Sequence, residues 1–139
     1  MIAFHVDGTL PKDGSIFVFG SNLAGIHGAG AAAVALNLGA KWGKGVGLQG
    51  KTYAIPTKDK NIKTMSLTEI LPYIEDFVRF TKDHPEMRFF VTRIGCGLAG
   101  YSDNQIAPLF SGAMNCSFAK EWRPFILKND DFQQDNQVV

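Results

Sequence analysis

Short apolar runs alternate along this chain with longer amphipathic stretches, and each pattern predicts one kind of element. The short runs are rich in β-branched and aromatic residues, which is typical of strands. Four of them are clear, namely Ser15–Phe19, Thr52–Ile55, Arg88–Arg93 and Pro124–Leu127. A fifth run, Ile2–Val6, is a candidate edge strand.

The stretches between these runs predict helices. Three are expected: Ala29–Leu38, the segment that follows Ser66, and Ile106–Phe110 after Ser102. Gly39 is a natural stop for the first helix. Ser66 and Glu69 have the spacing of a capping box, which is repeated after Ser102. Pro72 lies inside the second pattern and predicts either a kink or a later start.

Strands that alternate with helices predict an α/β fold with a mixed, mostly parallel sheet and helices on its faces. The 139 residues fit one domain, spanning 1–139, in which the polar residues 131–139 form a flexible tail. Ligands of such sheets bind where loops leave the carboxyl ends of the strands. The glycines of this chain gather at those positions.

The first glycine-rich segment follows the strand that ends at Phe19. It contains Gly20, Ser21, Asn22, Gly25, Gly28 and Gly30 before an alanine-rich helix. Glycine lets a ligand approach the backbone closely, and free N–H groups at a helix start suit a phosphate. The alternative is a tight crossover in which the glycines serve packing alone. The spacing matches neither a Walker P-loop nor a Rossmann loop.

A second segment of the same kind, Thr92–Phe110, carries Gly95, Gly97 and Gly100 between a strand and a capped helix. Two such loops side by side would clamp a diphosphate from both flanks. Tyr101, directly after this loop, either stacks on a ribose or base or belongs to the core.

A third strand delivers Thr57 and Lys58 to the same edge of the sheet. Lys58 is an anion partner or a nucleophile in one interpretation. In the other it is part of a solvated basic loop, because further lysines lie nearby in the sequence.

Composition narrows the class of protein. Hydrophobic residues make up 45% and charged residues 19%, as expected for a folded globular chain. The net charge of +1 argues against an extended nucleic-acid-binding surface. No apolar run approaches the roughly 20 residues of a membrane span, so no membrane partner is expected. Cys96 and Cys116 are interpreted as reduced thiols of a cytoplasmic protein, with one disulfide as the alternative. The scattered histidines predict no metal site, and no cofactor is expected.

Three motifs together resemble those of the macrodomain superfamily, the ADP-ribose-binding α/β/α modules, from Gly14 to Leu127. They read VFGSNLAGIHGAG, YAIPTKD and VTRIGCGLAGYSDNQIAPLF, and are similar to small bacterial and phage macrodomain-like proteins. RIGCGLAG is also similar to a loop of the terminal ADP-ribose protein glycohydrolase. The resemblance implies a three-layer α/β/α macrodomain-like fold with ADP-ribose across the carboxyl edge of the sheet.

Carried over by position, the resemblance implies that Asn22 faces the distal ribose. It implies two diphosphate loops, formed by Gly28, Ala29, Gly30 and Ala31 and by Gly95, Cys96, Gly97, Leu98, Ala99 and Gly100. Lys58 falls near the lysine nucleophile of the glycohydrolase. The catalytic aspartate of that enzyme is replaced here by Ala99, and Asp103 substitutes for it only if the loop folds back. His27 either bonds a ribose hydroxyl or phosphate or caps the turn.

These expectations support two functions. The first is a binding module, a reader or sequestering protein for ADP-ribose or a related NAD-derived nucleotide. The alternative is a hydrolase that removes ADP-ribose from a modified protein or nucleic acid, with Lys58, Asn22 and Asp103 as candidate catalytic residues. A Cys96–His27 nucleophile pair is weighed against a Cys96 buried under its turn. The candidate ligand-binding residues are Gly20, Ser21, Asn22, Gly25, His27, Gly28, Ala29, Gly30, Ala31, Thr57, Lys58, Gly95, Cys96, Gly97, Leu98, Ala99, Gly100 and Tyr101.

Overall fold

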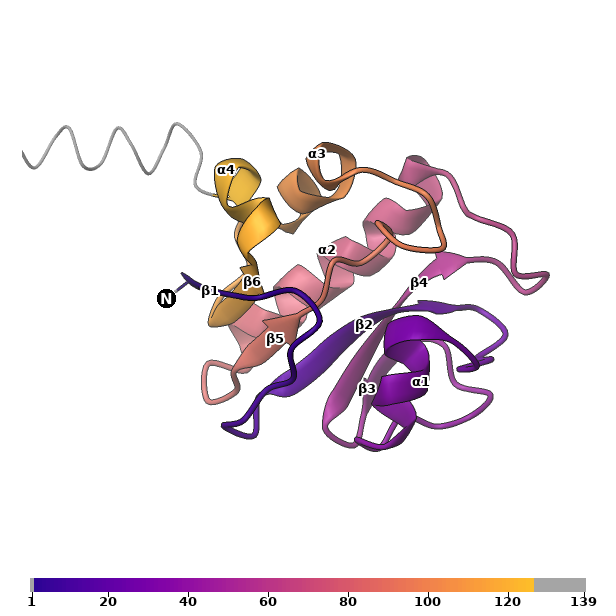
Figure 1. The fold of residues 1–139 in the computed structure, drawn as a ribbon, viewed down its shortest axis with the longest axis horizontal. Helices are drawn as coiled ribbons and strands as arrows, with labels where there is room; N and C mark the ends of the chain where they lie inside the picture. The colour runs from indigo at the N-terminus through magenta and orange to yellow at the C-terminus, as the bar shows by residue number, and fades with distance from the viewer. Residues whose placement is uncertain (1, 127–139) are drawn as a thin grey trace, which may run out of the picture.

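The computed structural model describes residues 2–126 and contains one six-stranded sheet (Figure 1). Its strands are β1 (Ile2–His5), β2 (Ile16–Asn22), β3 (Gly47–Gln49), β4 (Thr52–Lys58), β5 (Phe89–Val91) and β6 (Cys116–Ala119). They lie in the order β1-β6-β5-β2-β4-β3. All neighbours are parallel except β3 and β4, which form an antiparallel pair. The expected α/β fold with a mixed, mostly parallel sheet is confirmed.

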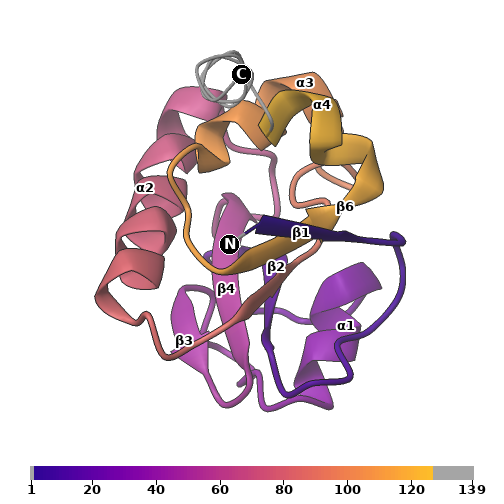
Figure 2. The same cartoon turned by 90° about the vertical axis from the view of Figure 1, so that its left-hand side faces the viewer.

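Helices cover both faces of the sheet. They are α1 (Gly30–Leu36), α2 (Leu67–Asp83), α3 (Asp103–Ile106) and α4 (Arg123–Ile126), with 3-10 turns η1 (Ala107–Phe110) and η2 (Lys120–Trp122). Figure 2 shows α1 and α2 on opposite sides of the strands. The central strand β2 accordingly buries side chains on both faces, as parallel strands between helical layers do. Phe17 and Phe19 pack on the α1 side, and Ile16 and Val18 on the α2 side.

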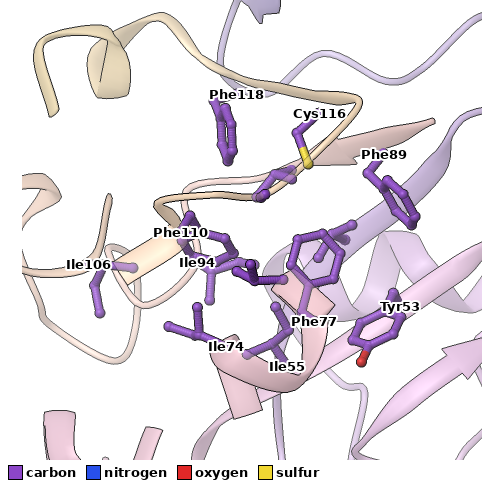
Figure 3. Packing of buried hydrophobic residues seen from close by; sticks show 14 of the residues in the cluster. Tyr53, Ile55, Ile74, Phe77, Phe89, Ile94, Ile106, Phe110, Cys116 and Phe118 are labelled. Atoms are coloured by element: carbon purple, nitrogen blue, oxygen red, sulfur yellow. The ribbon is translucent and has the colours of Figure 1, made fainter. Parts of the chain in front are cut away.

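The larger core lies between the sheet and α2 (Figure 3). Phe77 of α2 is at its centre, with ring contacts to Phe89 of β5 and Phe110 of η1. The capping box at the start of α2 is present, since the Ser66 side chain accepts from the Glu69 N–H and Glu69 accepts from the Ser66 N–H. The helix therefore starts directly after the capping box, at Leu67, and contains Pro72, so the later start that Pro72 suggested is wrong.

Two parts of the strand prediction are wrong. The run from Pro124 is not a strand, because residues 124–126 belong to α4, where the fixed φ of Pro124 suits a first helical turn. The last strand is instead β6, which the sequence analysis did not identify, and the short strand β3 was also missed. The candidate edge strand at the N-terminus is confirmed as β1, paired with β6. The predicted tail at 131–139 and residue 127 lie outside the described residues.

Three further expectations concern membranes, disulfides and metals. Within residues 2–126, the helices are all too short or too polar to cross a bilayer. Cys96 and Cys116 are both free, so the alternative of a disulfide between them is not realised. The described part of the chain contains no cluster of three His, Cys, Asp or Glu residues that would hold a metal ion.

Candidate ligand-binding cavity

A cavity of about 380 Å³ lies at the carboxyl edge of the sheet. Strand β2 pairs in parallel with both β4 and β5, so the segments that follow these three strands meet at one place. The cavity is lined by residues 20–22, 26, 28–32, 57, 58, 62, 92–95 and 97–99. Both glycine-rich loops thus line the same cavity, and its volume is within the range of small-molecule sites.

Asn22 shapes the first loop. Its Oδ1 accepts from the Ile26 N–H at 3.0 Å, and its Nδ2 donates to the Ile26 carbonyl at 2.9 Å. Its neighbour Ser21 is buried and donates its hydroxyl proton to the carbonyl of Gly45. Both side chains line the cavity, but their hydrogen bonds within the protein hold the loop in place.

The second loop consists of consecutive tight turns. The N–H of Cys96 donates to the Arg93 carbonyl at 3.1 Å, and that of Gly100 to the Gly97 carbonyl at 3.0 Å. Gly95 has a φ of +78°, which favours glycine. Leu98, at the tip, is 76% exposed. The turns present the backbone of 97–99 along the cavity wall.

Unpaired backbone donors occur in both loops. Within residues 2–126, the N–H groups of Gly97, Leu98 and Ala99 donate to no backbone carbonyl, and neither do those of Gly28 and Ala29. All five residues line the cavity. A Cβ atom built at Gly28 or Gly97 would have no neighbour within 4 Å, so both backbones are open to an approaching group. Two separate loops that line one cavity therefore contain N–H groups without a backbone partner.

Lys58 brings a positive charge to the same wall. It ends β4 next to Asn22, where the register of the β2–β4 pair shifts, and its carbonyl accepts from the Leu23 N–H at 2.9 Å. Its ammonium group forms no ion pair with any described residue. The adjacent Thr57 is buried, with its hydroxyl 3.4 Å from the Ser21 carbonyl. The expected placement of both residues at this edge is correct.

Six predicted site residues do not line the cavity, namely Gly25, His27, Cys96, Gly100, Tyr101 and Asp103. Gly25 packs against another loop, where a Cβ atom would lie 2.2 Å from the carbonyl carbon of Gly43. Tyr101 donates its hydroxyl proton to the Met65 carbonyl and packs against the core. Of the two interpretations of Tyr101, the structure supports the core residue.

His27 is fully buried and holds a neighbouring turn. Its Nε2 lies 2.9 Å from the carbonyl oxygen of Lys41 and 3.0 Å from that of Lys44. Because both partners are acceptors, Nε2 carries the proton. His27 therefore braces a turn, as one alternative from the sequence proposed, but the turn is 41–44 rather than its own.

Cys96 is not arranged as a nucleophile. Burial, followed by the nearby charge of Asp103, raises the pKa of its thiol to about 12. Its Sγ lies 3.5 Å from the Ile94 carbonyl, while His27 is engaged with Lys41 and Lys44. The structure thus does not form the Cys96–His27 pair.

Asp103 is held by other side chains. Arg93 donates to it twice, from Nε to Oδ1 at 2.9 Å and from Nη2 to Oδ2 at 2.7 Å, and Trp122 donates from Nε1 at 2.7 Å. The hydrogen bonds from Arg93 are the main cause that lowers the pKa of Asp103. The loop does not fold back, so the carboxylate of Asp103 does not occupy the position of Ala99, directly after the sequence GCGL.

The sequence analysis missed six residues of the lining, which are Ile26, Ala32, Ile62, Thr92, Arg93 and Ile94. Ile26 and 92–94 lie within or beside segments that the motifs had already singled out. Ile62 had no such signal. It has a φ of +61°, rare for a β-branched residue, in a loop tied together by the Asp59 carboxylate.

The fold and the site define an α/β protein whose cavity is built by two glycine-rich loops at the carboxyl edge of a mostly parallel sheet. Comparison of the chain with protein-family models, with curated proteins and with solved structures found no match. The function is therefore argued from the cavity itself.

Proposed function

We propose that this protein binds ADP-ribose, or a closely related NAD-derived nucleotide, as a macrodomain-like module. The observation that carries the proposal is the set of unpaired N–H groups that two loops contribute to one cavity. Backbone N–H groups are effective phosphate donors, since they are fixed in direction and need no side chain. A diphosphate has enough acceptor oxygens to use both loops at once.

The distribution of charge favours an anionic ligand. Residues 14–58, which include the first loop and β4, carry four lysines and no Asp or Glu. The four lysines are Lys41, Lys44, Lys51 and Lys58. Lys58 lines the cavity itself, whereas Arg93, the other cation of the lining, is already paired with carboxylates. Lys58 is thus the one cation of the described lining without a carboxylate partner, and a positive charge at a concave site raises the local concentration of anions.

The rim of the cavity suits the less polar parts of such a ligand. Ile26, Ile62 and Leu98 come from three different loops, line the cavity and are exposed. With the diphosphate between the glycine loops, a ribose and an adenine would extend over these aliphatic side chains. The resemblance to macrodomains points to the same ligand.

Calorimetric titration with ADP-ribose, NAD, ADP and ribose 5-phosphate tests the proposal. We expect ADP-ribose to bind, and a hundredfold excess over its Kd to stabilise the fold by about 2.7 kcal/mol. Gly97→Val is the variant designed to block the cavity. A Cβ atom at position 97 has no neighbour within 4 Å, and the φ of Gly97 is not positive, so we expect the variant to fold while its cavity is narrowed. This variant should have the melting temperature of the wild-type protein and should no longer bind ADP-ribose. Absence of heat with all four compounds in the wild-type protein would refute the assignment.

A hydrolase that releases ADP-ribose is the second candidate, favoured by the unpaired amine of Lys58 beside Asn22. Against it, no Asp, Glu or His belongs to the described lining, so a carboxylate or imidazole acid–base group is missing. Release of ADP-ribose from a modified protein or oligonucleotide is the measurement. If Lys58→Ala lost the activity and Lys120→Ala kept it, the protein would be established as a hydrolase. An inactive wild-type protein would exclude hydrolase activity on those substrates.

A further inference from the structure

The turn at residues 41–44 lies outside the cavity and displays an unusual side chain. Trp42 is 62% exposed, although tryptophan is usually covered by other groups. Lys41 and Lys44 flank it and are exposed as well. A large planar ring is thus presented to solvent in a turn that also carries two exposed lysines, of which Lys44 donates from Nζ to the Leu48 carbonyl at 3.1 Å.

Buried polar groups hold this turn rigidly. The Nε2 of His27 donates to the carbonyls of Lys41 and Lys44, as described above. Gln49, only 2% exposed, accepts from the Lys41 N–H at 2.8 Å and donates to the Lys44 carbonyl at 2.8 Å. The Gly43 N–H donates to the Gly25 carbonyl at 2.8 Å. Burying a polar group costs free energy unless it is hydrogen-bonded. Both amide atoms of Gln49 and the Nε2 of His27 are paired with the turn, which fixes the backbone beneath Trp42, whereas the buried Nδ1 of His27 has no partner among the described residues.

Preorganisation of this kind favours binding, because little entropy is lost when a partner arrives. The indole ring meets the rest of the protein through the edge-to-face contact with His27, at 6.3 Å between centroids. With 62% of the residue exposed, Trp42 offers surface to a partner.

The surrounding charge defines the chemistry of that partner. The turn itself carries two exposed lysines, Lys41 and Lys44, and no acidic residue, so a partner with negative charge is favoured. A second copy meeting through the same turn would bring Lys41 and Lys44 against their own copies, and symmetric dimers of that kind are disfavoured by repulsion. An acidic peptide supplies negative charge, but it offers a planar group to the indole only where an aromatic residue adjoins its carboxylates. A nucleic-acid strand supplies both in each nucleotide.

We propose that the turn 41–44 is a stacking platform for single-stranded nucleic acid. One base stacks on Trp42, and the phosphates on either side contact Lys41 and Lys44. Stacking on an exposed aromatic ring between lysines is a common mode of strand binding without sequence preference. The platform is small, in keeping with the low net charge of the chain, and does not depend on the proposed cavity ligand.

Fluorescence anisotropy with a labelled oligothymidylate of about 12 nucleotides at low salt tests the platform. We expect binding by the wild-type protein, a loss of about tenfold in affinity for Trp42→Ala, and retention of most affinity in Trp42→Phe. Lys41→Gln should weaken binding and flatten its salt dependence, whereas Lys120→Gln, an exposed lysine outside the acid-free segment, should not. Trp42 is exposed and Trp122 is buried, so quenching of the tryptophan emission should also report on the stacked base.

Two controls separate the platform from its alternatives. Trp42→Ala should still bind ADP-ribose, and Gly97→Val should still bind the oligonucleotide. Equal affinity of the wild-type protein and Trp42→Ala for the oligonucleotide would overturn the proposal. Loss of oligonucleotide binding in Gly97→Val would also overturn it, because the strand would then bind in the cavity. Polyglutamate that quenches Trp42 as strongly as the oligonucleotide would show an acidic-peptide site instead.

Discussion

Gly45 and Gly28 differ sharply in the space around their missing side chains. A Cβ atom at Gly45 would lie 1.9 Å from the Asn22 carbonyl oxygen, whereas one at Gly28 meets nothing within 4 Å. We predict that Gly45→Ala lowers the free energy of unfolding by about 2 kcal/mol or more, since the loop backbone must move. Gly28→Ala should stay within about 0.5 kcal/mol of the wild-type value. Urea denaturation of the pair checks this, and equal stability would contradict the observed packing of the two loops.

The raised pKa values of the two cysteine thiols predict how fast they react with an alkylating reagent. Burial raises the pKa of both thiols, Cys96 and Cys116, to about 12. The thiolate is the reactive form, so a raised pKa lowers reactivity over the whole range below pH 12. At pH 8 we expect iodoacetamide to label the folded protein on the order of a thousandfold more slowly than the urea-unfolded protein. Mass spectrometry measures both rates. Rapid labelling of folded Cys96 would show an activated thiol.

Single residues also show where prediction from sequence stops. Lys58 and Thr57 were placed correctly, because the end of a strand fixes which edge of the sheet a residue reaches. His27 and Tyr101 lie in or beside the glycine loops but point away from the cavity. Their partners, Lys41, Lys44 and Met65, are 14 to 36 residues distant in the chain. A local pattern contains no information about such partners.

Among the helices, α3 shows how a short element is held in place. Its first residue, Asp103, accepts hydrogen bonds from Arg93, which follows β5, and from Trp122 of η2. Asp103 therefore links these two segments. Since the folded-state pKa of Asp103 is lowered, its contribution to stability is present above the pKa of the unfolded state, about 3.9, and is lost as pH falls through the folded value.

We therefore predict that Asp103→Asn lowers the free energy of unfolding by about 2 kcal/mol at pH 7. The difference from wild type should shrink as the pH is lowered below about 4. Urea denaturation across this range is the measurement. Asp76→Asn is the matched control, because its pair with Arg79 is exposed and contributes little. A constant difference at all pH values would show that Asp103 acts by packing rather than charge.

The strands show a second limit of prediction. β6, with the sequence CSFA, is short and has no strong alternation, yet it pairs with β1 on one side and β5 on the other. These pairings come from distant parts of the chain, whereas the more apolar run from Pro124 lies in α4. The capping boxes before α2 and α3 were predictable because every partner lies within a few residues.

For the entire domain, the uneven charge has a kinetic consequence. Lys58, in a described lining that contains no Asp or Glu, should attract an anionic ligand over distances comparable with the Debye length, about 10 Å at 0.1 M salt. We predict that the association rate constant for ADP-ribose falls severalfold between low and moderate salt, and that Lys58→Gln reduces it at low salt. Stopped-flow fluorescence measures the rates, with Lys120→Gln as control. A rate independent of salt would argue against electrostatic attraction.

The pairing of β1 with β6 determines the order in which the domain can be completed. Ile2 is opposite Cys116 in the register, so β1 pairs with a strand that lies far from it along the chain. Strands β2, β3 and β4, all within residues 16–58, have short-range partners and can assemble while synthesis continues. Contacts between remote segments form slowly. During synthesis, β1 therefore has no partner from this sheet until β6 has been made, so its pairing comes after that of β2 with β4.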